Sequence, residues 1–123
     1  MAILRSLLFY PLFYGFSAFL VIASLFASVI GRDALVSVVD LWGKWHRWCV
    51  THILGIEIVL EGEVPDGAYL IAVKHESFFE AIDMAHLFTF PAVFAKRELF
   101  WIPGWGYSAK VYGLIPVARD KGA

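Results

Sequence analysis

A histidine and a glutamate five positions apart, His75 and Glu80, are the residues of this sequence best suited to acid–base chemistry. Histidine has a pKa near neutrality, so it can take a proton from a hydroxyl group as that oxygen attacks a carbonyl carbon. A carboxylate can hold the imidazole in one tautomer and stabilise the imidazolium that forms. In an unbroken helix the two side chains would point about 140° apart. The pairing therefore requires a helix that begins between them.

The same residues also have purely structural explanations. His75 can be a surface histidine, and Glu80 can lie on a solvated acidic helix face with Glu76 and Asp83, which share its helical spacing. Ser77 fits a helix cap near Glu80 better than it fits a nucleophile. A metal site has little support, because the sequence lacks further ligands at a characteristic spacing around this pair. The residues alone leave catalysis and a solvated surface both open.

The elements expected around His75 place it where a buried strand gives way to a helix. We expect strands over residues 56–61, 69–73, 92–95 and 114–117, and a helix over residues 77–88. Strands that alternate with helices predict an α/β fold with a mostly parallel sheet, in which catalytic groups gather at the carboxyl ends of the strands. Because the sequence stops a few residues after the last strand, we expect this sheet to be incomplete.

The amino-terminal segment, residues 1–33, contains no charged residue from Leu7 to Ile30. Such a run can form a helix long enough to cross the roughly 30 Å hydrocarbon core of a bilayer. The whole chain is 60% hydrophobic and 17% charged, whereas a soluble domain is about 45–50% apolar and about 25% charged. We therefore expect a membrane-spanning or membrane-dipping helix here, with a cleaved signal peptide as the competing interpretation.

Residues 34–55 have the pattern of an amphipathic helix that ends near Gly55. One face carries Asp40, Lys44, Arg47 and Thr51, and the opposite face carries Trp42, Trp45, Cys49 and Ile53. Tryptophan favours the headgroup level of a membrane, so this helix can lie in the interface. A tryptophan-rich helix packed on the core of a domain explains the same pattern, and both interpretations stay open.

Charge and cysteine content narrow the class of protein. A net charge of -1 provides no basic field for a nucleic-acid partner. The single cysteine, Cys49, cannot form an intrachain disulfide, which fits a catalytic part that faces the cytoplasm. The other histidines, His46, His52 and His86, are expected to be packed or to lie at a boundary rather than to bind a ligand.

Three blocks of the sequence resemble the phospholipid acyltransferase family that includes the 1-acylglycerol-3-phosphate acyltransferases. The family's His-x4-Asp hallmark corresponds to KHESFFEAID, which has glutamate at the acidic position. FAKRELFWIPGWG is similar to the family's Lys-x-Glu-Leu segment followed by Pro-x-x-Gly, and GLIPVAR is similar to its second block, which ends in arginine. The resemblance covers residues 41–119 behind an apolar amino-terminal segment, as in the family.

This resemblance implies that His75 and Glu80 are catalytic, and that Lys96 and Arg119 bind the phosphate of the acceptor lipid. A guanidinium suits phosphate through bidentate hydrogen bonds, and a lysine acts as a compact point charge. By resemblance, the reaction moves a fatty acyl group from acyl-CoA or acyl carrier protein to lysophosphatidic acid, with no metal or other cofactor. The implied location is the bacterial inner membrane, with the catalytic part in the cytoplasm.

The family's later Glu-Gly-Thr-Arg and proline-containing blocks do not occur in this sequence. The resemblance is therefore to the amino-terminal part of the family only, and residues 56–123 are expected to form a partial acyltransferase domain. Two alternatives follow from the missing blocks. The chain can be a catalytically inactive membrane-associated fragment, or its acceptor can be a different lysolipid.

Overall fold

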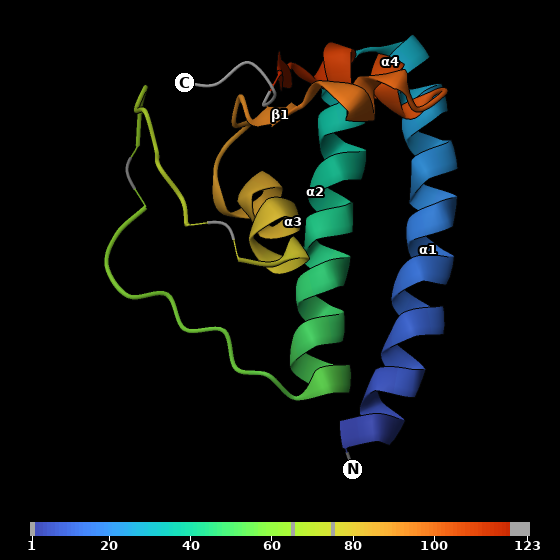
Figure 1. Ribbon diagram of the computed structural model, residues 1–123, viewed down its shortest axis with the longest axis vertical. Helices are drawn as coiled ribbons and strands as arrows, with labels where there is room; N and C mark the ends of the chain where they lie inside the picture. Colours follow the sequence, from blue (N-terminus) through green and yellow to red (C-terminus); the bar gives the residue numbers. More distant parts are fainter. Residues whose placement is uncertain (1, 65, 75, 119–123) are drawn as a thin grey trace.

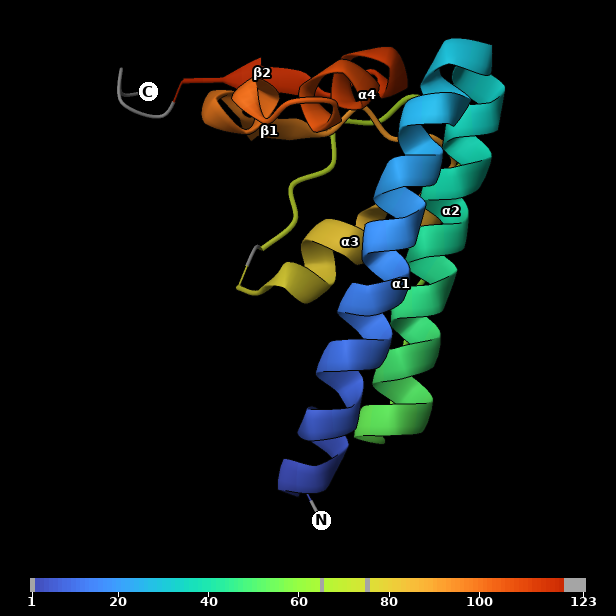
Figure 2. The ribbon, with the colours of Figure 1, turned by 90° about the vertical axis from the view of Figure 1, so that its right-hand side faces the viewer.

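The computed structural model describes residues 2–64, 66–74 and 76–118, and it is dominated by a pair of long antiparallel helices (Figure 1). Helix α1 (Ala2–Ile30) and helix α2 (Arg32–Trp48) lie side by side in both views (Figure 2). Gly31 joins them with a φ of 153°, a value that favours glycine. The sheet and α4 (Trp105–Tyr112) lie across the end of the pair where the two helices meet.

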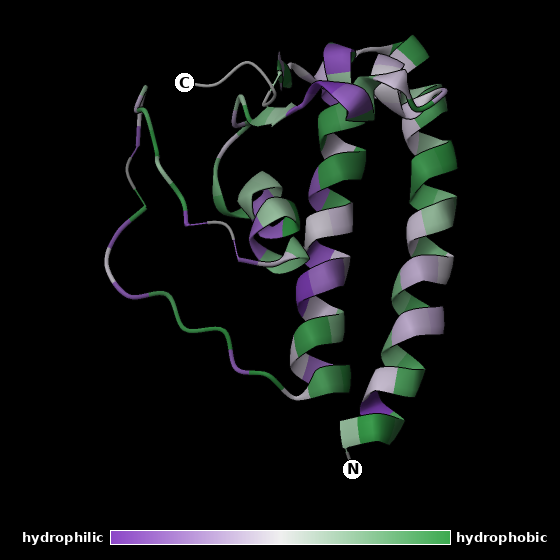
Figure 3. Ribbon diagram, in the orientation of Figure 1, coloured by the Kyte–Doolittle hydropathy of each residue, from purple (hydrophilic) through white to green (hydrophobic). Residues whose placement is uncertain are grey.

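Helix α1 is apolar along most of its length (Figure 3). By length and composition this helix qualifies as a membrane span. Some core helices and signal sequences meet the same criterion. Among the described residues, no second helix meets it. Its exposed surface is rich in large apolar side chains, which include Ile3, Leu7, Phe19, Phe26 and Ile30. The apolar helix expected near the amino terminus is confirmed.

The amphipathic helix expected over residues 34–55 is found, and its two faces contact different elements. On the tryptophan face, Trp42 Nε1 donates a hydrogen bond of 2.9 Å to Ser17 Oγ of α1, and the Trp45 ring lies 4.9 Å from the Phe16 ring. The polar face meets α3 (Phe78–Leu87). Packing against α1 thus accounts for two of the three tryptophans of this helix, and a position in the membrane interface stays a prediction.

The last turn of this helix changes from α to π geometry. The π-helix η1 (Cys49–Leu54) continues α2 directly and ends at Gly55, whose φ of 71° lies in the left-handed region. Thr51 Oγ1 donates to the carbonyl oxygen of Arg47 at 2.9 Å. The predicted end of the helix near Gly55 is confirmed, whereas the π turn was not expected, and such turns are often found at functional sites.

Two small cores hold the other elements to the helical pair. In the first, Phe13, Cys49 and Ile82 are buried together, so α1, η1 and α3 meet there. In the second, near the end of the pair where Gly31 joins the helices, Ala27 and Leu35 pack with Tyr112 of α4. Helix α3 is therefore anchored to the middle of the helical pair and α4 to its end.

The sheet has two short parallel strands, β1 (Phe94–Lys96) and β2 (Ile115–Val117). Phe94 pairs with Ile115, and Lys96 pairs with Val117. The chain passes from β1 through the 3-10 helix η2 (Arg97–Trp101) and then α4 before it enters β2. This is the strand–helix–strand connection that parallel strands need, so the predicted parallel arrangement is confirmed for this pair.

The two strands predicted earlier in the chain, over residues 56–61 and 69–73, are wrong. The described residues from 55 to 74 form a loop without helix or strand that runs outside the helices (Figure 1), and Leu70 is 92% exposed. Alternating and continuous apolar patterns are local signals, whereas a strand also requires a neighbour for its backbone hydrogen bonds. The fold described is mostly helical, with a small parallel sheet.

Candidate active site

The acidic member of the predicted pair, Glu80, lies in the first turn of α3. Ser77 caps this helix in an extended conformation, and its Oγ accepts a hydrogen bond of 3.1 Å from the Phe79 N–H. Glu80 Oε2 accepts hydrogen bonds of 2.8 Å from both the Ser77 N–H and the Ser77 hydroxyl. The reciprocal arrangement is a capping box, so the carboxylate of Glu80 folds back toward the residues that precede the helix.

The start of α3 satisfies one condition for a contact between residues 75 and 80. Pairing of residues 75 and 80 requires a helix that begins between them, and α3 begins at Phe78. His75 itself lies outside the described residues, and so does Arg119. Their predicted roles stay predictions.

Lys96, the predicted phosphate ligand, is the last residue of β1 and is exposed. Its register partner in β2 is Val117, which precedes Arg119 by two residues in the sequence. Parallel strands end at the same edge of a sheet, where ligands of open α/β folds are usually bound. Lys96 therefore lies at the sheet edge where such ligands are bound, and its role in binding a phosphate stays a prediction.

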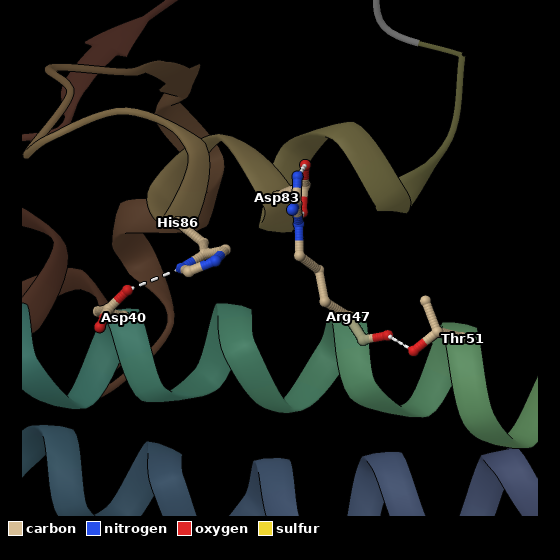
Figure 4. Close-up of polar contacts among 5 residues, drawn as sticks. All are labelled: Asp40, Arg47, Thr51, Asp83 and His86. Carbon is tan, nitrogen blue, oxygen red and sulfur yellow. Dashed lines mark hydrogen bonds and ion pairs between the residues drawn. The ribbon is translucent and has the colours of Figure 1, made fainter. Parts of the chain in front are cut away.

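A bidentate ion pair joins α2 to α3 (Figure 4). Arg47 Nε lies 2.5 Å from Asp83 Oδ1, and Arg47 Nη2 lies 2.9 Å from Asp83 Oδ2. The Asp83 side chain is 8% exposed and that of Arg47 is 29% exposed. The hydrogen bonds to Asp83 raise the pKa of Arg47, although burial opposes the shift. This partly buried pair was not predicted from the sequence.

A second polar contact ties the two helices one turn further along α3. His86 Nδ1 lies 2.9 Å from Asp40 Oδ1, and Lys44 Nζ lies 2.6 Å from Asp40 Oδ2. Partial burial raises the pKa of Asp40, but hydrogen bonds from Lys44 and His86 outweigh it, so this pKa lies below its usual value. Figure 4 shows the side chains of Asp40 and His86 between the two helices.

Residues 76, 80 and 83 do not form the solvated acidic face that the sequence left open. Glu76 is exposed and pairs with Lys74 at 2.5 Å, but Asp83 is buried against α2. The reason is that α3 packs on the polar face of α2, which offers Arg47 as a partner. Opposite charges on the two helix faces were the only signal in the sequence for this contact.

An open groove of about 440 Å³ adjoins the amino-terminal turn of α3. It is lined by Phe9, His46, Val50, Leu54, residues 56–59 and Phe79, and most of this lining is apolar. The His46 ring lies 5.1 Å from that of Phe13 and 5.4 Å from that of Phe79. Its Nδ1 atom is buried and has no partner among the described residues. Burial lowers the pKa of His46, although the charge of Asp83 opposes this shift.

The chain is similar in sequence to a curated protein of known activity. Over 86 residues the chain is 28% identical to the 1-acyl-sn-glycerol-3-phosphate acyltransferase of Pseudomonas aeruginosa. This chain resembles an acyltransferase. The match covers 68% of the chain and 33% of the relative, so the chain spans about a third of the length of that protein. No family model matches the chain, and no solved structure matches it.

The acyltransferase resemblance includes the candidate site. A match that covers 68% of a chain of 123 residues has to contain the middle of the chain, and therefore the segment from His75 to Glu80. Among the described residues, no group of three or more histidine, cysteine, aspartate and glutamate side chains is arranged to hold a metal ion.

Proposed function

We propose that the protein transfers a fatty acyl group from an acyl thioester to the free hydroxyl of 1-acyl-sn-glycerol-3-phosphate, which gives phosphatidic acid. The observation that carries this proposal is the capping box of α3, together with the similarity to an acyltransferase of that name. The capping box turns the Glu80 carboxylate back toward the segment that contains His75. In the proposal, this carboxylate orients the histidine base and stabilises its protonated form.

In the proposed reaction, His75 takes the proton of the acceptor hydroxyl as its oxygen attacks the thioester carbonyl carbon. Glu80 holds the imidazole in one tautomer and stabilises its protonated form. The tetrahedral intermediate then expels the thiolate of coenzyme A or acyl carrier protein, which receives the proton from His75. The acyl group moves directly from donor to acceptor, so no acyl-enzyme forms.

Lys96 and Arg119 are proposed to hold the acceptor phosphate. The support for Lys96 is its exposed position at the carboxyl end of β1, in register with Val117. Arg119 enters on the family resemblance and on its place two residues after Val117 in the sequence. Together, a lysine and an arginine supply the positive charge and the bidentate donors that a phosphate monoester requires.

The apolar surface of α1 supports a place at a membrane, which we propose is the bacterial inner membrane with the catalytic part in the cytoplasm. In this arrangement residues 1–33 dip into the bilayer as an anchor rather than cross it, because residues 34–55 pack along α1 and carry charged side chains, and both helices lie near the headgroup level. Residues 56–123 form part of the acyltransferase domain. Both the lysolipid acceptor and the phosphatidic acid product would then stay in the bilayer.

The test is acyl transfer from a radiolabelled acyl thioester to lysophosphatidic acid in detergent, by the protein expressed from its complete reading frame. We expect labelled phosphatidic acid to accumulate. Labelled lipid formed only from an amino-acid-derived lysolipid would contradict the proposed acceptor. Hydrolysis of the thioester without any acylated lipid would contradict the proposed reaction.

A further inference from the structure

Helix α3, which carries Glu80, is held against α2 by polar contacts at two places. Its residues Asp83 and His86 are three positions apart and therefore lie on one helical face. They meet Arg47 and Asp40, which are seven positions apart on one face of α2. These paired spacings fix the register between the two helices.

The contact with Arg47 constrains more than the distance between the helices. Two parallel hydrogen bonds from a planar guanidinium to a carboxylate define the plane of both groups. Asp83 is 5% exposed, so water does not offer it an equivalent partner. A rotation of α3 about its own axis would break one or both bonds.

This constraint reaches the candidate site because Glu80 and Asp83 are three residues apart, about one helical turn. The loop before α3 has no helix or strand over its described residues. The capping box fixes the Glu80 carboxylate relative to Ser77, so the seating of α3 on α2 sets where this capped end, with Glu80, lies. Arg47 contacts α3 within one turn of the capping box, closer along that helix than Asp40 does.

We propose that Arg47 and Asp83 are positioning residues for the acyl transfer, and that their ion pair holds the capped end of α3 in the place from which Glu80 acts on His75. This inference rests on the proposed function, since it assumes that Glu80 and His75 act together. Neither Arg47 nor Asp83 has to touch the substrate. The pair acts through the rotation of α3.

The experiment is a pH titration of the four histidine rings by NMR, using histidine-labelled protein in detergent micelles, with each signal assigned by single replacement. A carboxylate close to His75 raises the pKa of its imidazole, so Glu80→Gln should lower that pKa and calibrate the effect of the pair. The decisive variant is Arg47→Gln. Loss of a nearby positive charge alone would raise the pKa of His75, whereas loss of positioning would lower it.

We expect Arg47→Gln to lower the pKa of His75 by at least half of the drop caused by Glu80→Gln. Lys44→Gln is the matched control, since Lys44 is an exposed cation one turn away that pairs with Asp40 within α2. It should leave the pKa of His75 unchanged or slightly raised. An unchanged or raised value in Arg47→Gln would overturn the positioning role while leaving the pair of His75 and Glu80 intact.

Arg47→Lys keeps the test decisive if Arg47→Gln does not fold. This variant retains the charge and loses the bidentate geometry, so electrostatics alone predicts no change and positioning predicts a smaller drop. If Glu80→Gln itself leaves the pKa of His75 unchanged, the two residues do not interact. That result would contradict the proposed relay pair and, with it, the role assigned to Arg47 and Asp83.

Discussion

Gly43 of α2 lies directly beneath His86 of α3, so closely that a Cβ atom added at Gly43 would lie 2.7 Å from the Cβ of His86. Real Cβ atoms do not approach one another to this distance, so a larger residue at 43 would force the two helices apart. Gly43 sits between Asp40 and Arg47 along α2, and both contact α3. The glycine therefore allows the two polar contacts to form at close range.

Gly43→Ala is expected to destabilise the protein. Overpacking of a tight contact costs about 1–3 kcal/mol, and the better helix propensity of alanine offsets about 1 kcal/mol at most. The measurement is thermal or urea unfolding in detergent, followed by circular dichroism. Gly15→Ala is the control, since a Cβ at Gly15 meets nothing within 4 Å, and it should be neutral or stabilising. Equal stability of the two variants would contradict the close contact.

Removal of one partner of the Arg47–Asp83 pair should cost far more than removal of a surface pair. Asp83→Ala leaves a partly buried arginine without its carboxylate, and we expect a loss of about 3 kcal/mol, at the lower end of values for buried pairs because Arg47 is 29% exposed. Glu76→Ala breaks the exposed pair with Lys74 and should cost about 0–1 kcal/mol. The check is the free energy of unfolding of each variant, and comparable losses would argue against a buried pair.

Apolar replacement of both partners offers a second check on the same contact. The double variant Arg47→Met with Asp83→Leu removes both charges and keeps most of the volume, so its stability should return to within about 1–2 kcal/mol of the wild type. According to our inference, it should still fail to restore the pKa of His75. The double variant would then distinguish the effect of the pair on the stability of the protein from its effect on the position of Glu80.

The stability of the protein should fall as the pH drops below about 6.5, partly because of His46. Burial lowers the pKa of His46 in the folded state below its ordinary value of about 6.5, so the unfolded chain binds this proton more tightly. The contribution of neutral His46 is complete above about pH 6.5 and is lost as the pH falls toward the folded-state pKa. His46→Phe, which can pack between Phe13 and Phe79, should weaken this pH dependence of the melting temperature.

His52→Gln serves as the control for that measurement, because His52 is exposed. It should retain the pH dependence of the wild type. A His46→Phe protein whose melting temperature follows the wild-type curve from pH 7.5 to pH 5 would show that His46 is not buried as the structure has it.

Cys49 should be unreactive in the folded protein. The side chain is fully buried in the core shared by α1, η1 and α3, and burial raises the pKa of its thiol. Since the thiolate is the reactive species, iodoacetamide should label Cys49 only after unfolding. A variant with Cys49→Ala and Ser37→Cys places the single thiol on the exposed surface of α2 and should be labelled at once. Rapid labelling of native Cys49 would contradict this core.

Local signals explain which parts of the fold were predictable. The start of α3 follows from Ser77 and Glu80, which cap the helix through contacts two and three residues apart. The end of η1 follows from Gly55, which adopts the left-handed conformation that glycine allows. In each case the residues that determine the structure are neighbours in the sequence.

The features that could not be predicted depend on partners that are distant in the sequence. Residues 56–61 alternate as a strand would, but no neighbouring strand pairs with them in the described part of the chain, so the pattern alone was insufficient. Arg47 and Asp83 are 36 positions apart, and the sequence shows two polar faces without showing that they meet. The capping role of Ser77 was predicted, whereas the burial of Asp83 depends on how two helices pack.

The most direct test of the central claim is the rate of acyl transfer to lysophosphatidic acid in the His75→Ala and Glu80→Asp variants of the protein expressed from its complete reading frame. General base catalysis contributes about 10²–10⁴-fold, so His75→Ala should lower the rate by at least that much. Glu80→Asp should retain a measurable part of the activity, because the carboxylate survives. A His75→Ala protein as active as the wild type would contradict the account.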